Sequence, residues 1–187
     1  MVSSPSIEDG IDETKRTVVR LEQMIACTDV YYGATEAVAA CVLFRDWPDD
    51  RSYLELTDRL ENPADYEPGW FYRRELPALL SVAKKLPERP EVIMIDGYVW
   101  LGQESYPGLG AYLYEALGGA SAVIGVAKTL FKEGPAVRDV RRGTSIRPLY
   151  VTAAGMDLNE AAERVVQMHG KFRIPTLLKK VDRLCRS

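Results

Sequence analysis

The segment 24–44, MIACTDVYYGATEAVAACVLF, decides the fold of this 187-residue chain. Its residues 24–32 and 36–44 are mostly apolar or β-branched, so both stretches predict buried strands. Gly33 and Ala34 lie between them and supply a turn. Further along, residues 52–60 (SYLELTDRL) alternate polar and apolar side chains, which is typical of a half-buried strand. The three segments predict an antiparallel meander.

Downstream of the meander, the hydrophobic pattern alternates between helix and strand periods. Pro77 suits the first turn of a helix, where no backbone N–H bond is lost. In chain order, the pattern predicts a helix over 76–86, a strand over 92–97, a helix over 111–117, a strand over 122–127, a surface loop over 132–144, a strand over 146–152, and helices over 158–169 and 175–186. We therefore expect an α/β protein with a mixed sheet, in which the antiparallel meander is joined by parallel strands and flanked by helices. Residues 1–187 are expected to form one domain, with a disordered start over residues 1–13.

Composition narrows the protein class only slightly. The chain is 47% hydrophobic and 27% charged with a net charge of -3, which neither indicates nor excludes a nucleic-acid binder. It contains no run of 18 or more apolar residues and starts without a signal-peptide pattern. Cys27, Cys41 and Cys185 have neither metal-ligand spacing nor an even count. These features predict a cytoplasmic protein with no membrane segment.

Three carboxylates stand where chemistry is expected. Asp29 interrupts an apolar strand, Asp96 ends the most apolar strand, and Glu75 is predicted to open the helix between them. A carboxylate in an apolar strand is costly unless it is paired, hydrogen-bonded or bound to metal. Mg²⁺ prefers such hard oxygen ligands. Structural roles remain open for each one: an arginine pair for Asp29, an Asp-Gly turn for Asp96 and a helix cap for Glu75.

Several blocks of the sequence resemble one known family in the order in which that family has them. The blocks are TDVYY (28–32), YEPGWFYRRE (66–75), VIMIDG (92–97), IGVAK (124–128), RPLYV (147–151) and FRIP (172–175). Together they extend from about residue 26 to residue 184. On these motifs the chain resembles a divergent endonuclease V.

The resemblance implies an RNase H-like fold and cleavage of DNA or RNA on the 3′ side of inosine, one phosphodiester bond beyond the lesion. It implies that Asp29, Glu75 and Asp96 bind Mg²⁺, with Mn²⁺ as an alternative, and that Lys128 faces the scissile phosphate or the attacking water. Substrate-binding roles would fall to Tyr66, Pro68 and Gly69, as a wedge that fills the gap left by a flipped base, and to Arg74, for which a solvated helix start is the alternative.

The sequence departs from the family pattern in two places. The segment YVWLGQESYPGLG (98–110) lacks the family's basic pair, and the segment TAAGM (152–156) lacks the histidine that the resemblance places there. Asp157 could replace that histidine as a metal ligand. His169 does not match the missing residue and is expected on the surface at a helix end.

Three functions are compatible with this pattern. The first is a metal-dependent endonuclease that acts near deaminated bases, in DNA repair or RNA processing. The second is a catalytically weakened protein that binds nucleic acid on the same scaffold. The third is a different RNase H-like activity, such as a nuclease for structured or single-stranded substrates. Tyr98, Trp100 and Tyr106 in the altered segment could stack bases of a different substrate, pack the loop against the sheet, or form a self-association surface. The oligomeric state is not predicted.

Overall fold

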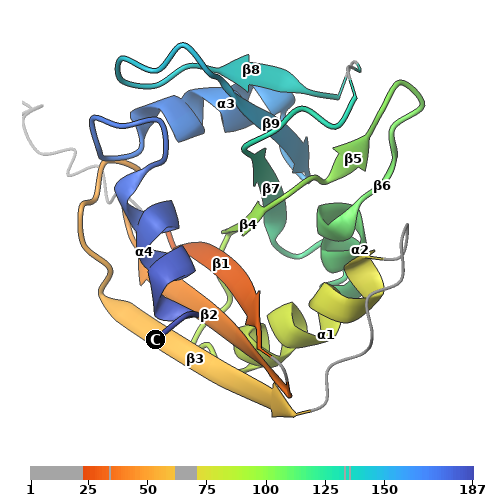
Figure 1. Ribbon diagram of the computed structural model, residues 1–187, viewed down its shortest axis with the longest axis vertical. Helices are drawn as coiled ribbons and strands as arrows, with labels where there is room; N and C mark the ends of the chain where they lie inside the picture. Colours follow the sequence, from red (N-terminus) through yellow and green to blue (C-terminus); the bar gives the residue numbers. More distant parts are fainter. Residues whose placement is uncertain (1–22, 34, 62–70, 133, 135) are drawn as a thin grey trace, which may run out of the picture.

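A seven-stranded mixed sheet with helices on both faces forms the body of the protein (Figure 1). The computed structural model describes residues 23–33, 35–61, 71–132, 134 and 136–187. The strands are β1 (Ile25–Tyr32), β2 (Glu36–Phe44), β3 (Leu54–Glu61), β4 (Val92–Asp96), β5 (Trp100–Leu101), β6 (Tyr106–Pro107), β7 (Ala122–Ala127), β8 (Arg138–Val140) and β9 (Leu149–Ala154). The helices are α1 (Phe71–Lys84), α2 (Leu109–Ala116), α3 (Leu158–Gln167) and α4 (Thr176–Leu184).

The order of strands in the large sheet is β3-β2-β1-β4-β7-β9-β8. Strands β1, β2 and β3 form the predicted antiparallel meander, and β4 and β7 run parallel to β1. Strand β9 returns antiparallel to β7, and β8 pairs antiparallel with β9 at the edge. This arrangement confirms the predicted mixed sheet and the RNase H-like class.

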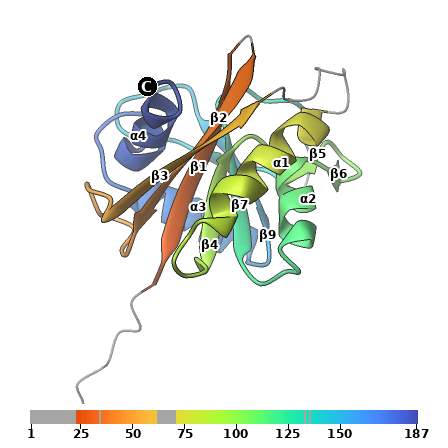
Figure 2. The ribbon, with the colours of Figure 1, turned by 90° about the horizontal axis from the view of Figure 1, so that it is seen from below.

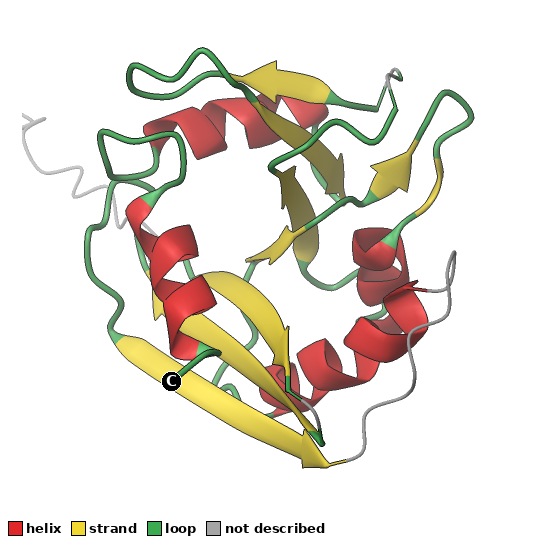
Figure 3. Cartoon of the chain, in the orientation of Figure 1, coloured by secondary structure: helices red, strands yellow, loops and turns green. Residues whose placement is uncertain are grey.

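Helices α3 and α4 pack on one face of the sheet, and α1 and α2 cover the other (Figures 2 and 3). Each face has its own apolar core because successive strand residues point to opposite sides. Cys27 and Met94 belong to the α3/α4 side, where their sulfur atoms lie 3.8 Å apart. Ala26 and Ile95 belong to the α1/α2 side.

Several elements differ from the sequence-based expectations. Helix α1 begins at Phe71, so Glu75 lies in its second turn and Pro77 lies inside the helix. The predicted loop over 132–144 contains strand β8. Strand β9 continues to Ala154, two residues past its predicted end. The small hairpin of β5 and β6 was not predicted at all.

Three further expectations concern membrane segments, the cysteines and the N-terminal residues. Over the described ranges, no helix is long and apolar enough to cross a membrane. Cys27, Cys41 and Cys185 are buried free thiols. The predicted disordered start, residues 1–13, lies outside the described residues.

Candidate active site

Asp29 and Asp96 lie side by side where two neighbouring strands of the sheet, β1 and β4, approach their carboxyl ends. Thr28 and Ile95 are paired across the parallel strands β1 and β4, and the two aspartates occupy the next position of each strand. Neighbouring strands are about 4.8 Å apart, so the register brings the two carboxylates together. The two-residue period places both on the α3/α4 face, in line with Cys27 and Met94.

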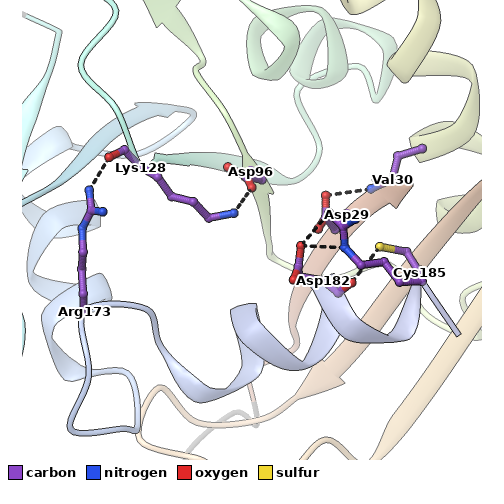
Figure 4. Close-up of polar contacts among 8 residues, drawn as sticks. Asp29, Val30, Asp96, Lys128, Arg173, Asp182 and Cys185 are labelled. Carbon is purple, nitrogen blue, oxygen red and sulfur yellow. Dashed lines mark hydrogen bonds and ion pairs between the residues drawn. The ribbon is translucent and has the colours of Figure 1, made fainter. Parts of the chain in front are cut away.

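Lys128 completes this row from the third parallel strand. It follows β7 directly, and the same period that buries Val126 on the α3/α4 face directs Lys128 to that face. Its Nζ donates to Asp96 Oδ2 at 2.5 Å (Figure 4). Although partial burial lowers the pKa of Lys128, the hydrogen bond and charge of Asp96 raise it above its ordinary value. Lys128 is therefore held charged beside the carboxylates.

Glu75 approaches the two aspartates from the opposite face of the sheet. Burial, followed by the charges of Asp29 and Asp96, raises the pKa of Glu75 to about 8. The neighbouring Arg74 stacks its guanidinium 3.9 Å from the centre of the Tyr32 ring. The Tyr32 hydroxyl donates to the Arg74 carbonyl at 2.9 Å, which fixes this turn of α1 against β1. The helix thus holds Glu75 near the ends of β1 and β4.

The surroundings of Asp29 disfavour its charged form. Burial, followed by the negative charge of Asp96, raises the pKa of Asp29 to about 6. The Val30 N–H donates to Asp29 Oδ1 at 2.8 Å and offsets only part of this penalty. Negative charge is therefore concentrated here in excess of what the local cations neutralise, and an additional cation would relieve the repulsion.

A fourth acidic residue, Asp182 on α4, borders the same site. It lines a cavity of about 550 Å³ together with Asp29, Asp96 and Lys128. Figure 4 shows α4 bringing Asp182 next to Asp29, and Arg186 of the same helix donates to Asp182 Oδ1 at 3.2 Å. Asp182 was not predicted as a site residue, because the pattern of residues 175–186 indicates only an amphipathic helix. The available signal was its position directly after Val181, at the border of the buried stripe.

The backbone around Asp96 depends on the glycine in the IGVAK motif. A Cβ at Gly125 would lie 2.7 Å from both Gly97 O and Thr152 Oγ1, so a larger residue would force the strands apart. Thr152 Oγ1 accepts a hydrogen bond from Val99 N at 2.8 Å. Gly125 and Thr152 therefore fix the chain as it leaves Asp96.

Asp157 cannot replace the missing histidine at this site. Ala154 pairs with Val123 at the start of β7, whereas Tyr150 pairs with Ala127 at its end. The residues that follow β9 therefore lie at the other end of the strands from Asp96. Asp157 caps α3 there, accepting from the backbone N–H groups of Asn159 and Glu160. The hypothesis that Asp157 is a substitute ligand is wrong because β9 runs antiparallel to β7.

The donor set at the site suits a hard divalent cation. Asp29 and Asp96 offer carboxylate oxygens on adjacent strands, and Mg²⁺ typically uses one or two protein carboxylates together with water and phosphate. In their present conformations, no three His, Cys, Asp or Glu side chains of the described residues form a group able to hold a metal. The fit therefore rests on the aspartate pair, with Glu75 and Asp182 in the surrounding layer.

The raised pKa values predict how stability depends on pH. Asp29 and Glu75 have ordinary pKa values of 3.8 and 4.5 that rise to about 6 and about 8 in the folded chain. Between these values the folded protein retains protons that the unfolded chain has released, so the free energy of unfolding falls as pH rises. We expect the melting temperature in EDTA to fall between about pH 5 and about pH 8, and to fall less in Glu75→Gln. An equal fall in Glu75→Gln and in the exposed-site control Glu115→Gln would contradict this assignment.

The remaining predicted residues divide between described and undescribed parts of the chain. Tyr66, Pro68 and Gly69 lie outside the described residues, and so the wedge stays a prediction. His169 is exposed beyond the end of α3, as expected, with Nδ1 3.0 Å from Thr176 Oγ1.

The aromatic residues of the altered segment have two different environments. The Tyr98 hydroxyl donates to Thr129 O, and the Trp100 indole donates to Ala153 O, each at 2.8 Å. Trp100 thereby ties the hairpin to β9, and Tyr98, whose hydroxyl also accepts from the Phe131 N–H, ties the segment before β5 to the loop after β7. Tyr106 is 61% exposed and carries no such role.

Comparison with known proteins gives the same family on sequence and on structure. The profile of the family described as endonuclease V matches residues 7–144. Endonuclease V of Streptomyces avermitilis is 29% identical over 141 residues, a match that spans 65% of this chain and 60% of that relative. The crystal structure of endonuclease V from the same organism has a TM-score of 0.72 at 27% identity, covering 87% of this chain and 79% of that one.

A structure with nucleic acid also shares the fold. Endonuclease V of Ciona intestinalis, crystallised with a DNA that contains an inosine followed by a ribo-adenosine, has a TM-score of 0.73 at 19% identity and covers 88% of this chain and 84% of that one. Because the family profile matches well over half of the sequence, from residue 7 to residue 144, the chain belongs to the endonuclease V family.

Proposed function

We propose that this protein is a divalent-metal-dependent endonuclease that cleaves nucleic acid on the 3′ side of a deaminated base such as inosine. The observation that carries the proposal is the row of Asp29, Asp96 and Lys128 at the ends of three adjacent parallel strands, all lining one cavity. Family membership and the inosine-containing DNA bound by the Ciona relative support the substrate class. DNA repair and RNA processing are both compatible with this activity.

The site residues would divide the work as follows. Asp29 and Asp96 would hold Mg²⁺ or Mn²⁺, which when bound polarises the phosphate and lowers the pKa of a water. Lys128, now paired with Asp96, would pair with the scissile phosphate when substrate enters. Glu75 would join the two aspartates as the third carboxylate beside the ion, whose positive charge would offset the repulsion from Asp29 and Asp96.

Other parts of the proposal rest on family resemblance. Tyr66, Pro68 and Gly69 would fill the gap left by the flipped base. Arg74 would support the turn that carries Glu75, since its guanidinium stacks on Tyr32. Residues 1–187 would form one domain, and the three free cysteines suit the reducing cytoplasm.

A second candidate is a protein that binds the same nucleic acid but cleaves it poorly. The observation that favours it is the β5/β6 hairpin, which stands where the resemblance expects a basic pair and exposes Tyr106 instead of arginine. Loss of phosphate contacts there would weaken binding of the substrate strand without altering the carboxylate row.

The deciding experiment is cleavage of end-labelled DNA and RNA strands that carry one inosine, single- and double-stranded, with Mg²⁺ or Mn²⁺. We expect a cut one phosphodiester bond beyond the inosine on its 3′ side that disappears in Asp96→Ala. Strands with adenosine in place of inosine control for base recognition. Absence of cleavage by the wild-type protein, with nucleic acid still bound, would replace the nuclease by the binding protein.

A further inference from the structure

The cavity beside the carboxylates extends far beyond what a metal and a phosphate need. Its volume is about 550 Å³. Its apolar wall is formed by β7, β9, α4 and the segment before α4, through Val126, Leu149, Phe172, Ile174, Leu178 and Val181. An apolar recess that opens directly beside a phosphodiester-cleaving site is a candidate for a flat, partly apolar group of the substrate.

Polar groups are placed at the rim of this apolar wall. Asp29, Asp96 and Lys128 mark the end where the scissile phosphate would lie, and Thr144 and Ser145 line the cavity as well. A hydroxyl can donate and accept a hydrogen bond, so Thr144 could meet the edge of any base, whereas the Ser145 hydroxyl bonds the backbone of Arg147. The combination fits one nucleotide, with its phosphate toward Lys128 and its base along the apolar wall.

Packing within the protein does not explain the exposed position of the Phe172 side chain. Its side chain is 64% exposed although it is one of the largest apolar residues of the cavity wall. The ammonium group of Lys171 lies 5.5 Å from the centre of the ring, where it could also meet a phosphate. An exposed aromatic face next to a cation is the arrangement that stacks a base in single-strand binding sites.

Two arginines hold this wall in place without a ligand. Arg142 is 5% exposed, and its guanidinium donates to the carbonyls of Met168, Gly170, Phe172 and Arg173. Arg173 in turn donates to the carbonyls of Lys128 and Pro148. The segment that carries Phe172 is thereby tied to the strand end that carries Lys128. A site fixed before binding loses less conformational entropy when its ligand arrives.

We propose that this cavity is a nucleobase subsite, which takes the base of a nucleotide adjoining the scissile phosphate and stacks it on Phe172. The inference rests on the proposed function for the position of the phosphate. Because stacking and hydroxyl contacts suit every base, the subsite accepts any base there and leaves recognition of the deaminated base to another part of the protein.

The test is equilibrium binding of an inosine-containing strand in EDTA, which withholds the metal and prevents cleavage. Matched strands lack the base of one of the two nucleotides that flank the scissile phosphate. We expect loss of the base at one of these positions to weaken binding to the wild-type protein about tenfold, the usual size of one stacking contact. Phe172→Ala should weaken binding of the intact strand by about the same factor.

The decisive outcome is the combination of the two changes. If the missing base and Phe172 are partners, Phe172→Ala should bind the intact and the abasic strand equally well, because the same contact cannot be lost twice. Tyr53→Ala removes another exposed aromatic, which precedes β3 at the end of the sheet where β1 begins, and should bind both nucleic-acid strands like the wild type. The subsite would be overturned if Phe172→Ala and base removal each weakened binding independently, so that their fold-changes multiplied. It would also be overturned if the wild-type protein did not bind the strand.

A second variant blocks the space instead of removing the stacking surface. Leu178→Trp fills the cavity from α4, and we expect it to weaken binding of the intact strand about tenfold while leaving binding of the abasic strand unchanged. Equal weakening of both strands would overturn the subsite. Cleavage by the wild-type protein in Mg²⁺ is measured separately. Coupling without cleavage refutes the proposed function alone, and cleavage without coupling refutes the subsite alone.

Discussion

Asp29→Asn is expected to slow cleavage of an inosine-containing strand by about 10³-fold while the protein becomes more resistant to heat. The amide keeps the shape of the side chain and its hydrogen bond from Val30 N, but it removes the charge that a metal would bind. It also removes the repulsion from Asp96 and the burial penalty that raise the pKa of Asp29 to about 6. Above that pH the substitution should add about 1 kcal/mol of stability.

The opposite signs of the two effects make this variant informative. Cleavage is measured under single-turnover conditions and stability by thermal unfolding in EDTA at about pH 8. Asp139→Asn, an exposed aspartate on β8, is the control and should change neither quantity. A slow Asp29→Asn protein that is also less stable would show that the carboxylate holds the fold and would remove the main support for its catalytic role.

Arg142→Ala is expected to lower the free energy of unfolding by about 3 kcal/mol, which corresponds to a fall of roughly 10 °C in melting temperature. The substitution leaves the carbonyls of Met168, Gly170, Phe172 and Arg173 without their buried donor. These carbonyls all belong to the connection between α3 and α4, and the hydrogen bond to the Met168 carbonyl is buried.

Neighbouring arginines supply the matched comparisons. Arg141→Ala removes an exposed arginine one residue away and should shift the melting temperature by about 2 °C or less. Arg142→Lys keeps the positive charge but loses the fork that reaches several carbonyls at once, so it should fall between wild type and Arg142→Ala. Equal melting temperatures for Arg141→Ala and Arg142→Ala would show that the carbonyls find other partners.

The sequence alone predicted the central elements because their side-chain patterns are strong. Strands β2 and β7 begin and end where the apolar runs do, at 36–44 and 122–127. Secondary structure was not predicted correctly where the side chains show no hydrophobic period. Strand β8 is three residues long and joins the sheet only through its pairing with β9, so residues 132–144 had the composition of a loop.

The candidate site shows the same division. The motifs around Asp29, Asp96 and Lys128 could be recognised in the sequence, but that the three residues share one face follows from the parallel register of β1, β4 and β7. Asp182 and Phe172 belong to the C-terminal part of the chain and reach the cavity only because α4 packs across β1. Because β9 runs antiparallel to β7, Asp157 lies at the other end of the strands from the site, and no local sequence pattern reveals the direction of a strand.

By itself, the sequence determined the class of fold and the chemical character of the site, because hydrophobic period and residue type are local properties. Only the tertiary structure decided which carboxylates meet, which arginine is buried and where the cavity opens. Those outcomes depend on strand order and register, and these are set by contacts between segments far apart in the chain.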